Sequence, residues 1–227
     1  MEQRSDGWPR VKIAILIEGK TEEVFLPALR QFLGTRLSGR MPRLVAHRSN
    51  GRVEKGDALR RIVEKHLHVG ADAVIALTDV YTGSIEFVDA ADAKWKMREW
   101  VGPDERRFFA HAAQYEFEAW LLPYWVDIQR LAKSDRGAPA GQPESVNHNK
   151  PPSAWISEIF EAGKSRRSYS KARDAARILL DNDLTIAAGA CPELKEFLNT
   201  ILGSAKVSSG IGDASRTPRK RAHRSTR

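Results

Sequence analysis

Cysteine is almost absent from this 227-residue chain, which contains a single one, Cys191. One cysteine cannot form an internal disulfide framework or a cysteine-based zinc cluster, so both classes of small stabilised domain are excluded. Because Cys191 directly precedes Pro192, it matches the start of a helix with proline at its first position. We therefore expect Cys191 to have a structural role.

Long hydrophobic runs are also missing. No apolar run approaches the roughly 18 residues that a membrane-spanning helix requires. The first ten residues, M-E-Q-R-S-D-G-W-P-R, contain no apolar segment of the kind found in a secretory signal. The hydrophobic fraction of 41% nevertheless allows a substantial core. These features predict a soluble cytoplasmic protein without a membrane partner. The length suits one α/β domain with additions, or one and a half small domains.

Net positive charge is low over most of the chain and concentrated at one end. The formal net charge is +8, and residues 204–227 carry seven basic side chains against one acid, a net +6. This end is rich in Ser, Gly and Arg, and we predict that it is a disordered basic tail. The tail could hold nucleic acid through phosphate contacts, or it could serve only as a solubilising end.

Short apolar runs alternate with amphipathic segments in the first half of the chain. Strands are predicted at residues 11–17, 43–47, 71–78 and 107–113, and helices at residues 21–33, 57–68 and 85–100. This order, with short connections, predicts an α/β fold with a mainly parallel four-stranded sheet flanked by helices, Rossmann-like in arrangement.

The second half of the chain is predicted to be helical after a long polar segment. Residues 134–152 are polar and contain prolines, which indicates a surface loop. Helices follow at residues 154–163, 170–180 and 192–202. We therefore expect a core at residues 11–133, a loop and helical C-terminal extension at 134–203, and the tail at 204–227.

Acidic residues follow three of the predicted strands. Glu18 follows the first strand, Asp79 the third, and Glu116 and Glu118 the fourth. The carboxyl ends of parallel strands share one edge of the sheet, where ligands usually bind, so these acids can converge. Magnesium prefers oxygen ligands and keeps several waters, so two or three carboxylates suffice. Such a metal would polarise a phosphoryl group and activate water.

Other acids in these segments have a simpler explanation. Thr21 is predicted to be a helix N-cap with Glu22 and Glu23 in the first turn, where acids are generally favoured. Glu116 is preferred as a ligand over Glu118, because Glu118 lies one turn into the next helix, where an exposed acid is the usual case. That helix is predicted to begin near residue 117 and to bury its aromatic side chains in the core. His111, inside the fourth strand, is expected to be structural.

Two of these segments resemble the Toprim fold, which is shared by topoisomerases, primases and the overcoming-lysogenization nucleases. They are E-G-K-T-E-E after the first strand and L-T-D-V-Y-T-G after the third. Together with H-A-A-Q-Y-E-F-E-A-W-L-L, Y-S-K and C-P-E-L, they more closely resemble an uncharacterised bacterial family, the domain of unknown function 4276. This resemblance spans about residues 11–202.

The Toprim resemblance implies roles for particular residues. Glu18 would be a metal ligand or a general acid and base, Asp79 a metal ligand, and Glu116 matches an acid of the related nucleases by position. Toprim enzymes usually carry D-x-D, whereas Tyr81 stands here in place of the second aspartate. A phenol is a poor magnesium ligand, so the number of metals, one or two, stays open. Glu116 or Glu118 could restore the missing charge.

Basic residues near the predicted edge could contact phosphate. The resemblance implies this for Lys171 in S-Y-S-K-A-R, although a solvated lysine on a helix is the favoured interpretation. For Lys20 and Arg48, phosphate contact and simple exposure to solvent both stay open. The first functional hypothesis is therefore a magnesium- or manganese-dependent nuclease, for which the resemblance implies an ATPase partner in phage defence. The alternative is a Toprim-like binding or regulatory subunit that docks on an ATPase or on nucleic acid.

Overall fold

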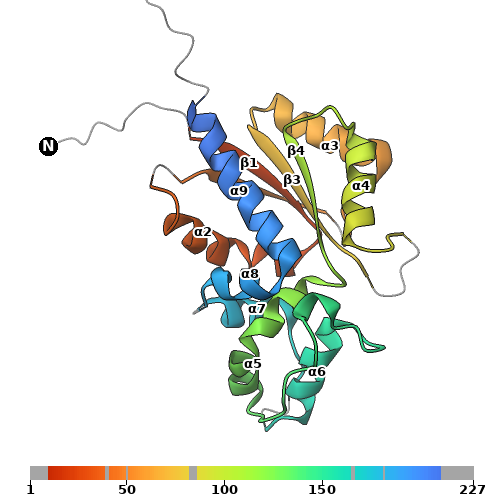
Figure 1. The fold of residues 1–227 in the computed structure, drawn as a ribbon, viewed down its shortest axis with the longest axis vertical. Helices are drawn as coiled ribbons and strands as arrows, with labels where there is room; N and C mark the ends of the chain where they lie inside the picture. The colour runs from red at the N-terminus through yellow and green to blue at the C-terminus, as the bar shows by residue number, and fades with distance from the viewer. Residues whose placement is uncertain are drawn as a thin grey trace, which may run out of the picture.

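Four parallel strands form the centre of the molecule (Figure 1). The computed structural model describes residues 10–38, 41–49, 51–81, 86–164, 167–180 and 182–210. The strands are β1 (Lys12–Ile17), β2 (Arg43–Arg48), β3 (Ala73–Asp79) and β4 (Phe108–Ala113), and they are arranged in the order β2-β1-β3-β4. Every neighbouring pair is parallel, so the predicted α/β fold with a flanked parallel sheet is confirmed.

The apolar content of each strand matches its place in the sheet. All seven residues of β3 and five of the six of β1 are buried, because these central strands are covered on both faces. In the edge strand β2, only Leu44 is buried, and the other five residues are exposed or partly exposed. The continuous apolar runs of the sequence therefore mark the two strands at the centre of the sheet.

Helices cover both faces of the sheet. α3 (Gly56–His68) and α4 (Ala90–Val101) pack on one face, where Leu59, Val63 and Met97 join Leu16 and Val74 in the core. α2 (Leu26–Gly34) and the long α9 (Pro192–Gly210) lie on the other face (Figure 1). The carboxyl ends of the strands are left facing the helical extension.

The first predicted helix is divided in two. α1 (Lys20–Glu23) follows an N-cap at Gly19, so the predicted N-cap at Thr21 is wrong. α2 starts again at Leu26 with Pro27 in its first turn. Proline has no backbone N–H to continue the hydrogen bonding of α1, which is why it stands at the beginning of a new helix.

The chain after β4 differs from its prediction in two places. The segment after β4 is a 3-10 helix, η1 (Phe117–Tyr124), which contains Pro123 and leads into α5 (Trp125–Ala132). The structure also contains a helix that the sequence did not indicate, α8 (Leu184–Ala190). The remaining elements are η2 (Pro143–Ser145), α6 (Pro152–Ala162) and α7 (Lys171–Leu180).

The last helix is longer than predicted. α9 continues through Ser204 to Gly210, and Ala205 is buried, so the tail does not begin at residue 204. Residues 211–227 lie outside the described residues. Among the residues that the structure describes, no helix has both the length and the apolar character needed to cross a membrane.

Candidate metal centre

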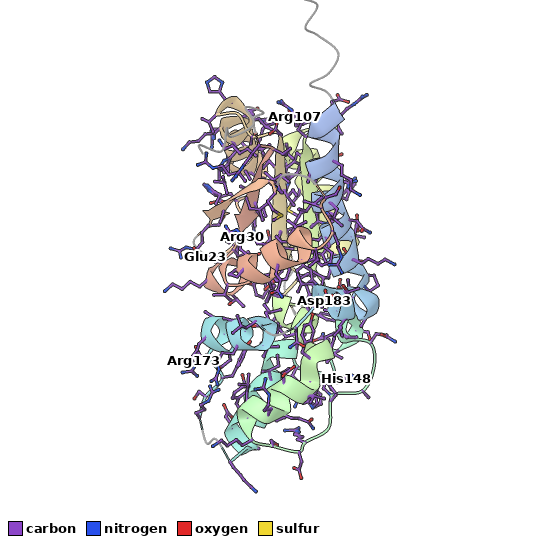
Figure 2. The ribbon with its side chains drawn as sticks, turned by 90° about the vertical axis from the view of Figure 1, so that its left-hand side faces the viewer. Glu23, Arg30, Arg107, His148, Arg173 and Asp183 are labelled. Carbon is purple, nitrogen blue, oxygen red and sulfur yellow. The ribbon has the colours of Figure 1, made fainter. Side chains whose placement is uncertain are left out.

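Five carboxylates are buried where β1 and β3 end against the helical extension. They are Glu18, Glu22, Asp79, Glu116 and Glu118. Here α1 and η1 both contact α7, so the edge of the sheet is covered by the extension. In Figure 2, Glu23 of α1 and Arg173 of α7 face the same side of the molecule, and the junction between α1 and α7 lies between them. The cluster therefore lies at the carboxyl end of a parallel sheet, as the sequence predicts for Glu18 and Asp79.

Glu18 is held by three hydrogen bonds. Its Oε1 accepts from the Thr78 hydroxyl and from the backbone N–H of Asp79 at 3.0 Å, and its Oε2 accepts from the Tyr81 hydroxyl at 2.6 Å. Burial raises the pKa of Glu18, although the hydrogen bonds from Thr78 and Tyr81 act in the opposite direction. Glu18 thus has a defined orientation next to the end of β3.

Asp79 is a second buried acid of the cluster, at the end of β3. Its Oδ1 accepts from the backbone N–H of Phe117 at 3.0 Å, which joins the end of β3 to the start of η1. Burial raises the pKa of Asp79 well above its usual range, and the charges of Glu18 and Glu22 raise it further. Glu118 also raises this pKa, whereas the nearby positive charge of Lys171 lowers it, so negative charge exceeds positive charge around Asp79.

Glu22 takes part in the helix start that the sequence predicts, but it is also buried in the pocket. Its Oε2 accepts from the backbone N–H of Gly19 at 2.9 Å, so it satisfies a donor ahead of α1. Its neighbour Glu23 points to the surface and pairs with Arg48 at 3.1 Å. Of these two acids, therefore, only Glu22 adds charge to the cluster.

Glu118 is not the exposed acid that the sequence suggested, and that prediction is wrong. It is 1% exposed, because η1 is a 3-10 helix whose side chains are almost all buried against the extension. Its Oε2 accepts from Lys171 Nζ at 3.2 Å, whereas its buried Oε1 has no hydrogen-bond partner. Burial raises the pKa of Glu118 to about 7, and Lys171 partly offsets this effect.

Lys171 is paired rather than solvated, which corrects the favoured interpretation of the sequence. Its side chain is 46% exposed, and its Nζ lies 3.2 Å from Glu118 Oε2 and 3.8 Å from Glu116 Oε1. Burial disfavours the charged ammonium, but Glu118 and Glu116 outweigh this effect, so the pKa of Lys171 is raised. Lys171 is therefore a positive group at the edge of the acidic pocket, whereas Lys20 lies exposed at the start of α1.

Glu116 precedes η1 as its N-cap and contacts the helical extension. Its Oε2 accepts from the backbone N–H of Ser153 at 3.1 Å, in the first turn of α6. Glu116 is buried, as its place at the edge of the sheet predicts. Its contacts are with α6 and with Lys171.

A residue that the sequence did not single out keeps Lys171 in place. Asp174 is fully buried and accepts from Arg167 at 2.7 and 3.0 Å, from Arg173 at 3.2 Å, and from the backbone N–H of Ser170 at 2.8 Å. These bonds fix the start of α7, where Lys171 is the first residue. A serine followed by an acid within one helical turn is the signal that could have indicated this cap.

The donor chemistry of the pocket fits a hard cation held by two carboxylates. The backbone N–H of Asp79 donates to the Glu18 carboxylate, so the two residues are neighbours, and magnesium is usually bound through one or two carboxylates together with water. Within the described part of the chain, no three acidic, histidine or cysteine side chains lie close enough together to hold a metal. The assignment of Glu18, Asp79, Glu116 and Glu118 as metal ligands therefore stays a prediction.

Comparison with known proteins gives a family and two similar folds. The family model described as Domain of unknown function (DUF4276) matches residues 17–202. The C-terminal region of the Burkholderia pseudomallei OLD protein aligns over 85% of this chain and 98% of its own, with 14% identity and a TM-score of 0.47. The corresponding region from Xanthomonas campestris pv. campestris aligns over 87% and 97%, with 14% identity and a TM-score of 0.49. No curated protein matches this sequence.

Proposed function

Because the chain belongs to the family described as Domain of unknown function (DUF4276), as its motifs predicted, and this description names no activity, we propose a function from the acidic pocket. The proposal is a divalent-metal-dependent phosphodiesterase, most specifically a nuclease of the Toprim type. Magnesium or manganese would be the metal, and Glu18 and Asp79 would be its ligands. The OLD-protein regions are similar in fold, at 14% identity.

The observation that carries this proposal is the uncompensated charge around Asp79. Asp79 is buried beside Glu18, and both carboxyl groups have raised pKa values because burial opposes their charged forms. Placing charged carboxylates together away from water is costly unless a positive group offsets them. Lys171 is one such group, but Glu118 and Glu116 already pair with it. A divalent cation would supply the remaining compensation.

The side chains of the pocket can divide the work of phosphodiester cleavage. A bound metal would polarise the phosphoryl oxygen and favour formation of the attacking hydroxide. Thr78 and Tyr81 hold Glu18 in one orientation, and the backbone N–H of Phe117 does the same for Asp79. Lys171 is half-exposed and is kept charged by Glu118, so it can contact a non-bridging phosphate oxygen.

Nucleic acid is the proposed substrate. The resemblance to Toprim nucleases supports this choice, and the net charge of +8 suits a polyanionic partner. From the same resemblance we also propose a cytoplasmic role in phage defence beside an ATPase partner.

Two observations favour a second candidate, a binding or regulatory subunit without catalysis. The described side chains include no group of three that could hold a metal. In addition, Tyr81 offers a phenol at the edge of the pocket where a carboxylate would bind a metal better. Such a subunit would dock on nucleic acid or on an ATPase and would keep the acidic pocket for structural reasons.

Replacement of the two proposed ligands tests the catalytic function. Glu18→Gln and Asp79→Asn keep size and remove charge, so metal-dependent cleavage should fall at least about 100-fold, equivalent to about 3 kcal/mol of transition-state stabilisation. Glu23→Gln is the matched control, because Glu23 is the last residue of α1, next to the pocket residue Glu22, and pairs with Arg48 outside the pocket. Cleavage is measured on labelled single- and double-stranded DNA and RNA, with and without magnesium or manganese.

The outcomes separate the two candidate functions. Loss of cleavage in both pocket variants, with normal thermal transitions and an active Glu23→Gln control, supports the phosphodiesterase. Full activity in both pocket variants would reject Glu18 and Asp79 as catalytic groups. If the wild-type protein cleaves none of these substrates, with or without a candidate ATPase, yet binds nucleic acid, the binding subunit is favoured.

A further inference from the structure

Tyr81 connects the acidic pocket to the segment that follows β3. Its hydroxyl donates to Glu18 Oε2 at 2.6 Å, and its ring is half-buried. The guanidinium of Arg52 lies 5.0 Å from the ring centroid and is itself paired with Glu86 at 3.0 Å. The guanidinium therefore lies over the Tyr81 ring and supports it. A tyrosine hydroxyl is protonated at neutral pH, so it acts as a hydrogen-bond donor to Glu18.

The hydrogen bonds of Glu18 limit what else it can bind. A carboxylate has about four lone-pair positions on its two oxygens. The Thr78 hydroxyl and the Asp79 backbone N–H occupy both positions on Oε1, and Tyr81 occupies one on Oε2. At most one position, on Oε2, remains free. Glu18 can thus accept one cation through a single oxygen while keeping all three hydrogen bonds.

Two-metal sites need a different arrangement. Their ions lie about 3.5–4 Å apart, and a carboxylate commonly bridges them with one oxygen on each ion. Glu18 cannot bridge in this way, because both positions on Oε1 are already used by donors. Tyr81, two residues after Asp79, supplies a neutral phenol and not a carboxylate, and a phenol is a poor ligand for a hard cation.

We propose that Tyr81 is a positioning residue that orients Glu18 as a one-oxygen ligand and limits this pocket to a single divalent cation. This inference rests on the proposed metal-dependent function, and it adds the number of ions and the residue that determines it. Hydrogen-bonded partners of metal ligands typically change metal affinity about 10- to 100-fold when they are removed.

Titration with manganese, followed by electron paramagnetic resonance of the free ion, gives the number of sites and their affinity without any activity assay. The wild-type protein should bind one ion. Tyr81→Phe keeps the ring and removes the hydroxyl, so it should also bind one ion, with affinity weakened about 10- to 100-fold. Tyr81→Asp supplies a carboxylate in place of the phenol and should bind a second ion.

Tyr124→Phe is the matched control. The Tyr124 hydroxyl donates to the backbone carbonyl of Asp183 at 3.0 Å, so this variant also loses one phenolic hydrogen bond. That bond joins η1 to the start of α8 and involves none of the five carboxylates. Its manganese affinity should equal that of the wild type. The thermal transition of each variant, measured in a chelator, checks that the fold is retained.

Each outcome has a distinct meaning for the inference and for the proposed function. Two ions in the wild type, or an affinity of Tyr81→Phe within twofold of the wild type, overturns the inference even if metal-dependent cleavage is found. One ion with the expected loss in Tyr81→Phe supports the inference even if no cleavage is detected, and then only the proposed catalysis fails. A wild-type protein that binds no manganese overturns both.

Discussion

At the scale of single residues, His111 shows how burial controls a titratable group away from the acidic pocket. It lies in β4, its Nε2 is 3.0 Å from the Thr200 hydroxyl of α9, and its ring meets the edge of Phe197. Burial lowers the pKa of His111 to about 4, Glu196 acts to raise it, and Lys94 and Arg98 lower it. His111 is therefore neutral in the folded protein at neutral pH.

The depressed pKa of His111 predicts a loss of stability in acid. Between pH 6.5 and 4 the unfolded chain binds a proton at this histidine and the folded protein does not, so stability falls as the pH falls. The full effect is about 3 kcal/mol for a shift of this size. His111→Gln should remove this part of the pH dependence, as measured by urea unfolding at pH 4.5 and pH 7.

The buried carboxylates have the opposite effect, which makes the comparison with the variant necessary. Acids with raised pKa values, such as Asp79 and Glu118, stabilise the folded state at low pH and lose that contribution as the pH rises. They are unchanged in His111→Gln, so the difference between the two proteins isolates the histidine. An identical pH dependence in both proteins would contradict the assignment.

Lys171 has a stability role that can be separated from any activity. Lys171→Met leaves Glu118 buried without its donor, and we expect a loss of about 1–2 kcal/mol in the free energy of unfolding. Adding Glu118→Gln should recover part of this loss, because the neutral amide no longer needs the ammonium. Lys20→Met, at an exposed position, should change stability by less than about 0.5 kcal/mol. Additive effects of the two pocket substitutions would contradict a direct interaction.

At the scale of elements, the close approach of α5 and α6 depends on a glycine. Gly163 follows α6, and a Cβ at this position would lie 2.1 Å from the Ala132 carbonyl oxygen at the end of α5. The backbone N–H of Lys164 also donates to the Lys133 carbonyl at 3.1 Å. The two helix ends are therefore held together by backbone contacts that leave no space for a side chain.

Substitution of this glycine should destabilise the helical extension. Gly163→Ala requires a backbone shift and is expected to cost about 1–3 kcal/mol, a typical value for overpacking. Gly189→Ala in α8 is the control, because a Cβ there meets nothing within 4 Å, and alanine favours the helix by up to about 1 kcal/mol. Thermal unfolding measures both variants, and a Gly163→Ala variant as stable as wild type would disprove this packing.

At the scale of the whole molecule, the positive charge beyond α9 predicts how nucleic acid binding depends on salt. Residues 211–227 carry six basic side chains and one acid, a net +5 of the total +8. Each phosphate neutralised contributes about −0.9 to the slope of log affinity against log salt on duplex DNA. If these residues bind DNA, their removal should make the slope shallower by several units.

Truncation after Gly210 is the suitable form of this experiment, because Ala205 is buried and belongs to α9. Binding of labelled duplex is measured by fluorescence anisotropy between 50 and 200 mM salt. The thermal transition should stay close to that of the full chain. Equal salt slopes with and without residues 211–227 would favour the solubilising role instead.

Local patterns in the sequence determined the architecture of this protein. The apolar runs of β1 and β3 indicated central strands, because only strands buried on both faces lack polar alternation. The alternation of strands with amphipathic helices then required parallel pairing, which places Glu18 and Asp79 at one edge. The family was also evident from the sequence motifs alone.

The environment of each acid was decided only by the tertiary structure. The burial of Glu118 and its bond to Lys171, 53 residues away, depend on how η1 packs against α7. The hydrogen bond between Tyr81 and Glu18 depends on how β1 and β3 pair. Helical periodicity and capping preferences describe neighbours within a turn or two. They carry no information about contacts between distant segments, and these contacts set the charge, orientation and pKa of the pocket.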